Sequence, residues 1–152
     1  MKPEDASIET RLIHGGHDRN ASFGASSTPI FQVSTYHQDN PEHLGKYDYA
    51  RSDNPTREAL ETAIADLEGG ARGLAFASGM AATSSVLMIF AAGDHLVVGE
   101  DVYGGTYRIL TAVLKRWGLE ATFVDSTDPA AIRAAITPKT KGIFVETPSN
   151  PT

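Results

Sequence analysis

The sequence predicts an α/β fold, in which an extended N-terminal arm precedes a mostly parallel sheet with helices on both faces. From residue 54 onward, short apolar runs alternate with stretches of helical periodicity at the spacing of βα units, which is typical of a parallel sheet. Residues 1–53 show little periodicity and hold four of the five histidines. We therefore divide the chain into an arm, 1–53, and the first part of a larger domain, 54–152.

The composition excludes several classes of protein. The 152 residues carry a net charge of −6, and 41% of them are hydrophobic, which predicts a globular chain with a real core. The negative charge argues against nucleic acid or an anionic membrane as a partner, and no apolar run reaches transmembrane length. The absence of cysteine excludes disulfides, thiolate metal sites and cysteine nucleophiles, and favours a cytoplasmic location.

The arm holds more large apolar side chains than a solvated tail needs. Ile8, Leu12 and Ile13 predict one short helix that ends at Gly15-Gly16, and Pro29 predicts an extended segment after it. The large side chains of the arm beyond that helix are Phe23, Ile30, Phe31, Val33, Tyr36, Tyr47 and Tyr49. We expect the arm to dock on a neighbouring subunit.

A helix start opens the second part of the chain. Asn54 is a cap residue and Pro55 suits the first helical position, while Gly69 ends the helix. Leu60, Ile64 and Leu67 form a stripe that we expect to face the core. The elements predicted after it are a strand at 73–77, a buried helix at 80–90, a strand at 95–98, a helix at 103–117 with Ile109/Val113 and Leu110/Leu114/Trp117 at helical spacing, a strand at 121–124, a helix from Pro129 capped by Asp128, and a strand at 142–146.

The turn at Ser78-Gly79 joins a predicted strand to a predicted helix. Ser78 suits an N-cap and Gly79 allows close approach, so the free N–H groups there can bind an anion, most often a phosphate. The alternative is an ordinary βα turn without a ligand. Residues 73–82 lack the Gly-x-Gly-x-x-Gly pattern, so a dinucleotide is poorly supported. Two further polar clusters, 100–103 and 146–150, also follow predicted strands, where ligands of parallel sheets bind.

Five motifs occur in a fixed order along the chain. They are Leu-Ile-His-Gly-Gly at 12–16, Tyr-Ala-Arg at 49–51 with Asn-Pro-Thr-Arg at 54–57, Ala-Ser-Gly-Met-Ala-Ala at 77–82, Asp-Val-Tyr-Gly-Gly-Thr-Tyr-Arg at 101–108, and Glu-Thr-Pro-Ser-Asn-Pro at 146–151. With these motifs the chain resembles the N-terminal part of the Cys/Met-metabolism pyridoxal phosphate (PLP) enzymes. This transsulfuration group includes cystathionine γ-lyase, cystathionine γ-synthase, cystathionine β-lyase and methionine γ-lyase.

The resemblance implies two phosphate contacts. Tyr49 and Arg51 would reach across a dimer interface to the phosphate of a neighbour's cofactor, which a planar guanidinium binds in bidentate fashion. Gly79 and Met80 would bind the phosphate of their own subunit through main-chain N–H groups. The alternatives are a surface arginine with a packed tyrosine, and a plain βα turn.

The resemblance also implies contacts to the cofactor ring and the substrate. Tyr103 would stack on the pyridine ring and transfer protons, Asn150 would donate to the 3-hydroxyl oxygen, and Arg108 would join Arg51 and Tyr103 in binding substrate. The alternatives are a packed aromatic residue, a turn-forming asparagine and a surface ion-pair residue. His14 and His17 have metal-like spacing, but without a third ligand we expect packing or solvent exposure and no metal.

The implied protein is a cytoplasmic homotetramer, a dimer of dimers, with an aminotransferase-like (fold type I) domain. The implied reaction is γ-elimination of cystathionine to cysteine, 2-oxobutyrate and ammonia, in cysteine biosynthesis and methionine metabolism. Gly105 argues against methionine γ-lyase activity, since methionine γ-lyases usually have cysteine at this position. The cofactor-bearing lysine and the aspartate that pairs with the pyridine nitrogen are expected beyond Thr152. The alternatives are cystathionine γ-synthase, which performs γ-replacement on an O-acylhomoserine with cysteine, and a non-catalytic binding or assembly fragment.

Overall fold

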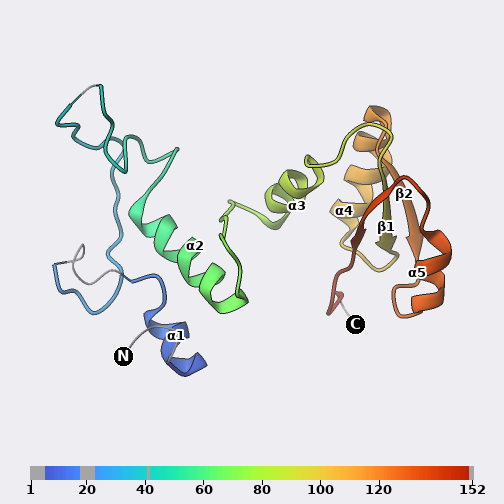
Figure 1. Ribbon diagram of the computed structural model, residues 1–152, viewed down its shortest axis with the longest axis horizontal. Coiled ribbons are helices and arrows are strands. Elements are labelled where there is room, and N and C mark those ends of the chain that lie inside the picture. Colours follow the sequence, from blue (N-terminus) through green and yellow to red (C-terminus); the bar gives the residue numbers. More distant parts are fainter. Residues whose placement is uncertain (1–5, 18–22, 41, 151–152) are drawn as a thin grey trace. The chain divides into compact units, whose positions relative to one another are not determined.

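The computed structural model describes residues 6–17, 23–40 and 42–150. The chain forms two compact units, Met1–Ala75 and Phe76–Thr152 (Figure 1). The expected division at residue 53 stays a prediction. No helix among the described residues has both the length and the apolar character that crossing a membrane requires.

Two helices organise the first unit. Helix α2 (Pro55–Glu68) begins at the predicted residue with Asn54 as its cap, and α1 (Ile8–His14) is the predicted short helix, capped by Ser7. Arg11 Nε lies 2.9 Å from Asp66 Oδ2 and joins the two helices. Gly16 has φ +72° and lies so close to α2 that a Cβ would collide with the carbonyl of Ala59, which explains the glycine after α1.

The arm is fastened to the start of α2 by polar contacts. Outside α1 its described residues lack helices and longer strands, and one isolated antiparallel bridge joins Thr35 to Tyr49. Asn54 Nδ2 donates to the Phe31 carbonyl (3.0 Å), and the Phe31 N–H donates to Thr56 Oγ1 (2.9 Å). The N-terminal end of α2 therefore fixes the course of the arm within the unit.

Two predictions for this part of the chain were wrong. Leu60 and Ile64 are 53% and 47% exposed, and α2 has no buried residue, because nothing in the described chain covers the predicted stripe. Residues 73–77 form no strand. Gly73 packs against the main chain of Glu61, and the Ala75 N–H donates to Glu61 Oε1 (2.9 Å), so a side chain of α2 takes the bond that a neighbouring strand would need.

The second unit is an α/β arrangement around a three-stranded parallel sheet, which confirms the predicted fold class. The strand order is β2-β1-β3. Its elements are α3 (Gly79–Leu87), β1 (His95–Gly99), α4 (Gly104–Arg108), the π-helical turn η2 (Ile109–Val113), the 3₁₀ turn η3 (Leu114–Trp117), β2 (Glu120–Val124), α5 (Pro129–Ala135) and β3 (Thr140–Phe144).

Strand β1 forms the centre of this unit. All five of its residues are buried, and Val98 lies opposite Phe123 of β2 and Phe144 of β3. The core around it consists of Leu87, Leu96, Val98, Leu110, Leu114 and Leu119. Because both neighbours run parallel to β1, the carboxyl ends of the three strands lie at one edge.

His95, the first residue of β1, links all three strands. It is 4% exposed, and its Nδ1 lies 2.8 Å from Thr140 Oγ1 of β3 while its Nε2 lies 2.9 Å from Thr122 Oγ1 of β2. A buried imidazole with both nitrogens hydrogen-bonded carries no unpaired polar group. This histidine is structural, since its ring is occupied on both sides.

Several element boundaries differ from the predicted ones. The last strand begins at Thr140 instead of residue 142, because the pairing shifts between His95 and Leu96 and so brings Thr140 opposite His95. The helix predicted at 103–117 changes to π and then 3₁₀ geometry after Arg108. Leu110 and Leu114 are buried as the spacing predicts, but Trp117 is 64% exposed, since these turns do not keep the 3.6-residue period.

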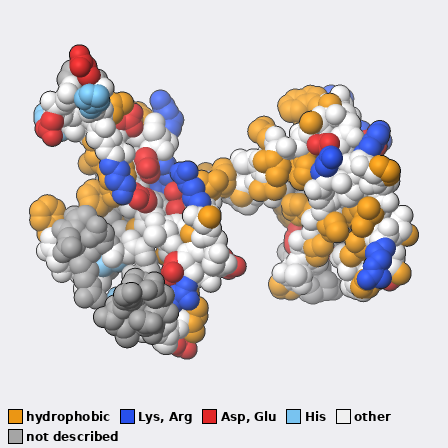
Figure 2. Space-filling model, in the orientation of Figure 1, with side chains coloured by type: hydrophobic (Ala, Val, Ile, Leu, Met, Phe, Trp, Pro, Cys, Tyr) orange, Lys and Arg blue, Asp and Glu red, His pale blue; other side chains and the backbone are white. Residues whose placement is uncertain are grey.

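Large hydrophobic side chains reach the surface of both units (Figure 2). The predicted buried helix at 80–90 is α3, in which only Leu87 is buried. Val86 is 49% exposed, and Met88 and Ile89 beyond the helix are 71% and 75% exposed. An apolar sequence indicates that a helix can be buried, but the covering surface must come from elsewhere.

We predict that His95→Ala destabilises the second unit by about 2–4 kcal/mol, because it removes two hydrogen bonds and leaves a cavity at the centre of the sheet. Urea unfolding of the complete protein measures this change. Lys139→Ala, which removes an exposed side chain 3.8 Å from Glu120, is the control and should shift stability by less than about 1 kcal/mol. Equal effects of the two variants would contradict a structural role for His95.

Candidate functional site

The start of α3 presents main-chain donors. Ser78 Oγ accepts from the Ala81 N–H (3.1 Å), and the Ser78 carbonyl accepts from the Ala82 N–H (3.1 Å). Among the described residues, the N–H groups of Gly79 and Met80 have no acceptor, and a Cβ on Gly79 would meet nothing within 4 Å. These two donors at an accessible helix start suit an anion.

The side chains of Met80 and Tyr103 meet over Gly105. A Cβ on Gly105 would lie 2.6 Å from Tyr103 Cε1 and 2.7 Å from Met80 Sδ, so glycine is needed for both side chains to keep their places. Tyr103 precedes α4 and is 57% exposed. The structure thus brings the open donors of α3 next to an accessible aromatic ring.

Glu146 joins this group from the adjacent strand. It follows β3, and its Oε2 accepts a hydrogen bond from the Tyr103 N–H (2.9 Å). Glu146 belongs to the motif at 146–151, which by itself predicts no role for this residue. The signal in the sequence that could have indicated a role is that Glu146 directly follows an apolar strand, as the polar cluster at 100–103 does.

Arg108 and Asn150 are both exposed. Arg108 ends α4, and Asn150 lies in the segment after β3. Pro151, the last residue of the fifth motif, lies outside the described residues. The roles of both residues stay predictions.

Tyr49 and Arg51 belong to the first unit and contact each other. The guanidinium carbon of Arg51 lies 4.8 Å from the centroid of the Tyr49 ring, a cation–π contact that orients the guanidinium. Arg57, on α2, donates to the carbonyls of Ala50 (3.4 Å) and Ser52 (2.6 Å) and so fastens the main chain around Arg51. Arg57 belongs to the motif at 54–57, which by itself predicts no role for this residue.

A second tie holds the same segment. Lys46 Nζ lies 2.6 Å from Glu58 Oε1, and the Tyr47 hydroxyl donates to Glu58 Oε2. The hydrogen bonds from Lys46 and Tyr47 lower the pKa of Glu58, the bond to Glu58 raises the pKa of Lys46, and burial raises the pKa of Tyr47. The contribution of Glu58 to stability is therefore present above its ordinary pKa of 4.5 and lost as the pH falls through its lowered pKa.

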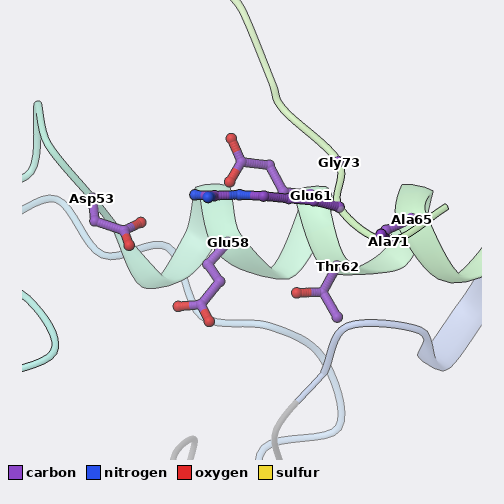
Figure 3. Close-up of a pocket in the computed structure, with 8 residues that line it drawn as sticks. Asp53, Glu58, Glu61, Thr62, Ala65, Ala71 and Gly73 are labelled. Carbon is purple, nitrogen blue, oxygen red and sulfur yellow. The ribbon is translucent and has the colours of Figure 1, made fainter.

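A pocket of about 310 Å³ lies along α2 (Figure 3), and neither Tyr49 nor Arg51 is among the residues that line it. Asp53, Glu58 and Glu61 line it, and Figure 3 shows their carboxylates around one stretch of the helix. Glu61 is held by Ala75 and lies 3.6 Å from Arg57 Nε. Arg72 also lines the pocket, but three carboxylates face its one guanidinium, so the net negative charge of the wall disfavours an anion and does not match the predicted phosphate contacts.

The two histidines with metal-like spacing have different surroundings. His17 Nδ1 lies 3.2 Å from Thr28 Oγ1, and its Nε2 lies 2.8 Å from the Ala25 carbonyl, so packing within the arm uses both nitrogens. His14 ends α1 and is exposed.

The chain is similar to several known proteins. A cystathionine β-lyase of Bacillus subtilis is 52% identical over the whole chain, which covers 39% of that protein, and a probable cystathionine γ-synthase of Herpetosiphon aurantiacus is 48% identical over 97% of the chain and 46% of that protein. The crystal structure of cystathionine γ-lyase from Lactobacillus plantarum complexed with L-serine superposes with a TM-score of 0.88 at 53% identity, over 96% of this chain and 38% of that one. The chain thus spans less than half of each of these relatives. Residues 9–152 match the Cys/Met metabolism PLP-dependent enzymes, and the chain belongs to this family.

Proposed function

We propose that the complete protein cleaves cystathionine by PLP-dependent γ-elimination and gives cysteine, 2-oxobutyrate and ammonia. The observation that carries this proposal is the meeting of Met80 and Tyr103 over Gly105, which sets open N–H donors beside an accessible aromatic ring. A phosphorylated pyridine suits this pair of features, because N–H donors bind a phosphate and an aromatic side chain stacks on a pyridine ring. The choice of cystathionine as the substrate rests on the names of the relatives.

The residues present fit PLP. Gly79 and Met80 would hold the phosphate through their N–H groups, Tyr103 would stack on the ring, and Asn150 would donate to the 3-hydroxyl oxygen. Tyr49 and Arg51 would bind the phosphate held by a neighbouring subunit. When bound, PLP supplies an electron sink for the substrate's α-carbon.

The protein's own residues would position the substrate and move protons. Arg51 and Arg108 would orient the substrate, since their charges complement its carboxylates. Tyr103 would carry a proton on its hydroxyl, which its exposed ring leaves accessible. The cofactor-bearing lysine and the aspartate for the pyridine nitrogen would lie outside this chain. The complete protein would be a cytoplasmic tetramer with active sites shared across a dimer interface.

Two other reactions have support in the names of the relatives. β-Elimination, which cleaves the other carbon–sulfur bond of cystathionine and gives homocysteine, pyruvate and ammonia, is favoured by the 52% identity to a cystathionine β-lyase. γ-Replacement on an O-acylhomoserine is favoured by the 48% identity to a probable cystathionine γ-synthase.

The test is an absorption spectrum of the complete protein with PLP, followed by product analysis with L-cystathionine. We expect a protein-bound cofactor band that changes when cystathionine is added, with 2-oxobutyrate and cysteine as products. Pyruvate and homocysteine would assign β-elimination, and turnover that needs an O-acylhomoserine with cysteine would assign γ-replacement. A protein that binds no PLP would support the non-catalytic alternative.

We predict that Arg51→Ala weakens PLP binding about 10- to 100-fold, because it removes charge-assisted hydrogen bonds to the phosphate. Titration of the cofactor-free protein measures the affinity. Arg72→Ala, which removes an arginine from the same unit, is the matched control. Unchanged affinity in the Arg51 variant would contradict the phosphate role.

Gly105 sets the place of the Tyr103 ring, because any larger residue must displace it or Met80. We predict that Gly105→Ala weakens PLP binding about tenfold, since overpacking of this kind costs about 1–3 kcal/mol. Gly104→Ala is the matched control, because a Cβ at Gly104 meets nothing within 4 Å. Equal cofactor affinities of the two variants would show that Gly105 does not act through the ring.

A further inference from the structure

The two segments that carry Tyr103 and Asn150 leave adjacent strands. Val98 of β1 pairs with Phe144 of β3, so the chain after each strand emerges at the same edge of the sheet. The first segment leads to Tyr103 and α4, and the second passes through Glu146 on its way to Asn150. The hydrogen bond from the Tyr103 N–H to Glu146 Oε2 (2.9 Å) ties the two segments together.

This bond completes the fixation of the Tyr103 main chain. The Tyr103 carbonyl accepts from the N–H groups of Thr106 (2.8 Å) and Tyr107 (3.2 Å), which belong to α4. Tyr103 stands at the cap position of α4, and its own side chain makes no capping bond. Glu146 therefore holds the N–H side of a residue whose carbonyl side is held by the helix.

The ring depends on this main-chain anchor. Tyr103 is 57% exposed, so packing holds only part of the ring, above Gly105 and beside Met80. Because packing restrains the ring only in part, the position of the ring also depends on the position of the Tyr103 main chain. The hydrogen bond to Glu146 is itself exposed, so it contributes little to overall stability.

We propose that Glu146 is a positioning residue for the cofactor site, whose carboxylate holds the Tyr103 main chain so that the ring lies flat against the cofactor. The proposal rests on the proposed function, in which Tyr103 stacks on PLP. Glu146 acts through Tyr103 and touches neither cofactor nor substrate in this role.

The test compares Glu146→Ala with Glu146→Gln in the complete protein loaded with PLP. The readouts are the circular dichroism of the cofactor band, which reports how the ring is held, and the PLP affinity. We expect Glu146→Ala to lose most of the dichroism and to bind PLP about tenfold more weakly. Glu146→Gln should restore both, because the amide oxygen still accepts from the Tyr103 N–H. Thermal unfolding of both variants should match the parent.

Glu120→Ala is the matched control, since it removes an exposed carboxylate at the opposite end of the sheet. Unchanged dichroism and affinity in Glu146→Ala would overturn the proposal. Equal losses in the Gln and Ala variants would also overturn it, because the effect would then not depend on the accepted hydrogen bond.

A separate measurement distinguishes failure of this proposal from failure of the proposed function. Hydrogen exchange of the Tyr103 N–H is measured in the protein without PLP. Faster exchange in Glu146→Ala than in the parent and Glu146→Gln supports the anchor even if the parent binds no PLP. Equal exchange in all three proteins overturns the anchor, whatever the cofactor does.

Discussion

The second unit depends on one buried strand and on the histidine at its start. β1 is buried along its whole length, and His95 bonds to a threonine on each neighbouring strand. This arrangement fixes both registers at once, because a shift of either neighbour would leave a buried imidazole nitrogen without a partner. With the registers fixed, the chain after β1 and the chain after β3 emerge side by side, and Tyr103 and Glu146 come within hydrogen-bonding distance.

The first unit relies on polar contacts where the second relies on burial. α2 has no buried residue, yet its side chains hold the arm at several points: Asn54 and Thr56 bond to Phe31, Glu58 bonds to Tyr47, and Arg57 bonds to the carbonyls before and after Arg51. The motif at 54–57 thus holds the main chain of the motif at 49–51 in place. The contact between Arg51 and the Tyr49 ring orients this pair without a ligand, and in the proposed function it would lower the entropic cost of binding a phosphate.

Small residues in the site make room for large ones. Gly105 lets Tyr103 and Met80 meet, and Gly79 leaves the donors of α3 uncovered. Gly105 is therefore sterically required. The adjacent Gly104 is not, since a Cβ there would meet nothing within 4 Å. The same geometry underlies the proposed role of Glu146. The Tyr103 ring is more than half exposed, so its position depends on the main chain, whose N–H donates to Glu146.

Local sequence determined the caps and starts of four helices, because Ser7, Asn54, Ser78 and Asp128 bond to residues two or three positions away. It also marked the motifs of the family. Only the tertiary structure decided that 73–77 is not a strand, since Glu61 of α2 takes the Ala75 N–H, and that the stripe of Leu60 and Ile64 stays exposed. It alone placed Arg57 beside the carbonyls around Arg51, and Glu146 beside the Tyr103 N–H. A capping bond is local, whereas burial, strand pairing and an acceptor on an adjacent strand depend on residues far away in the chain.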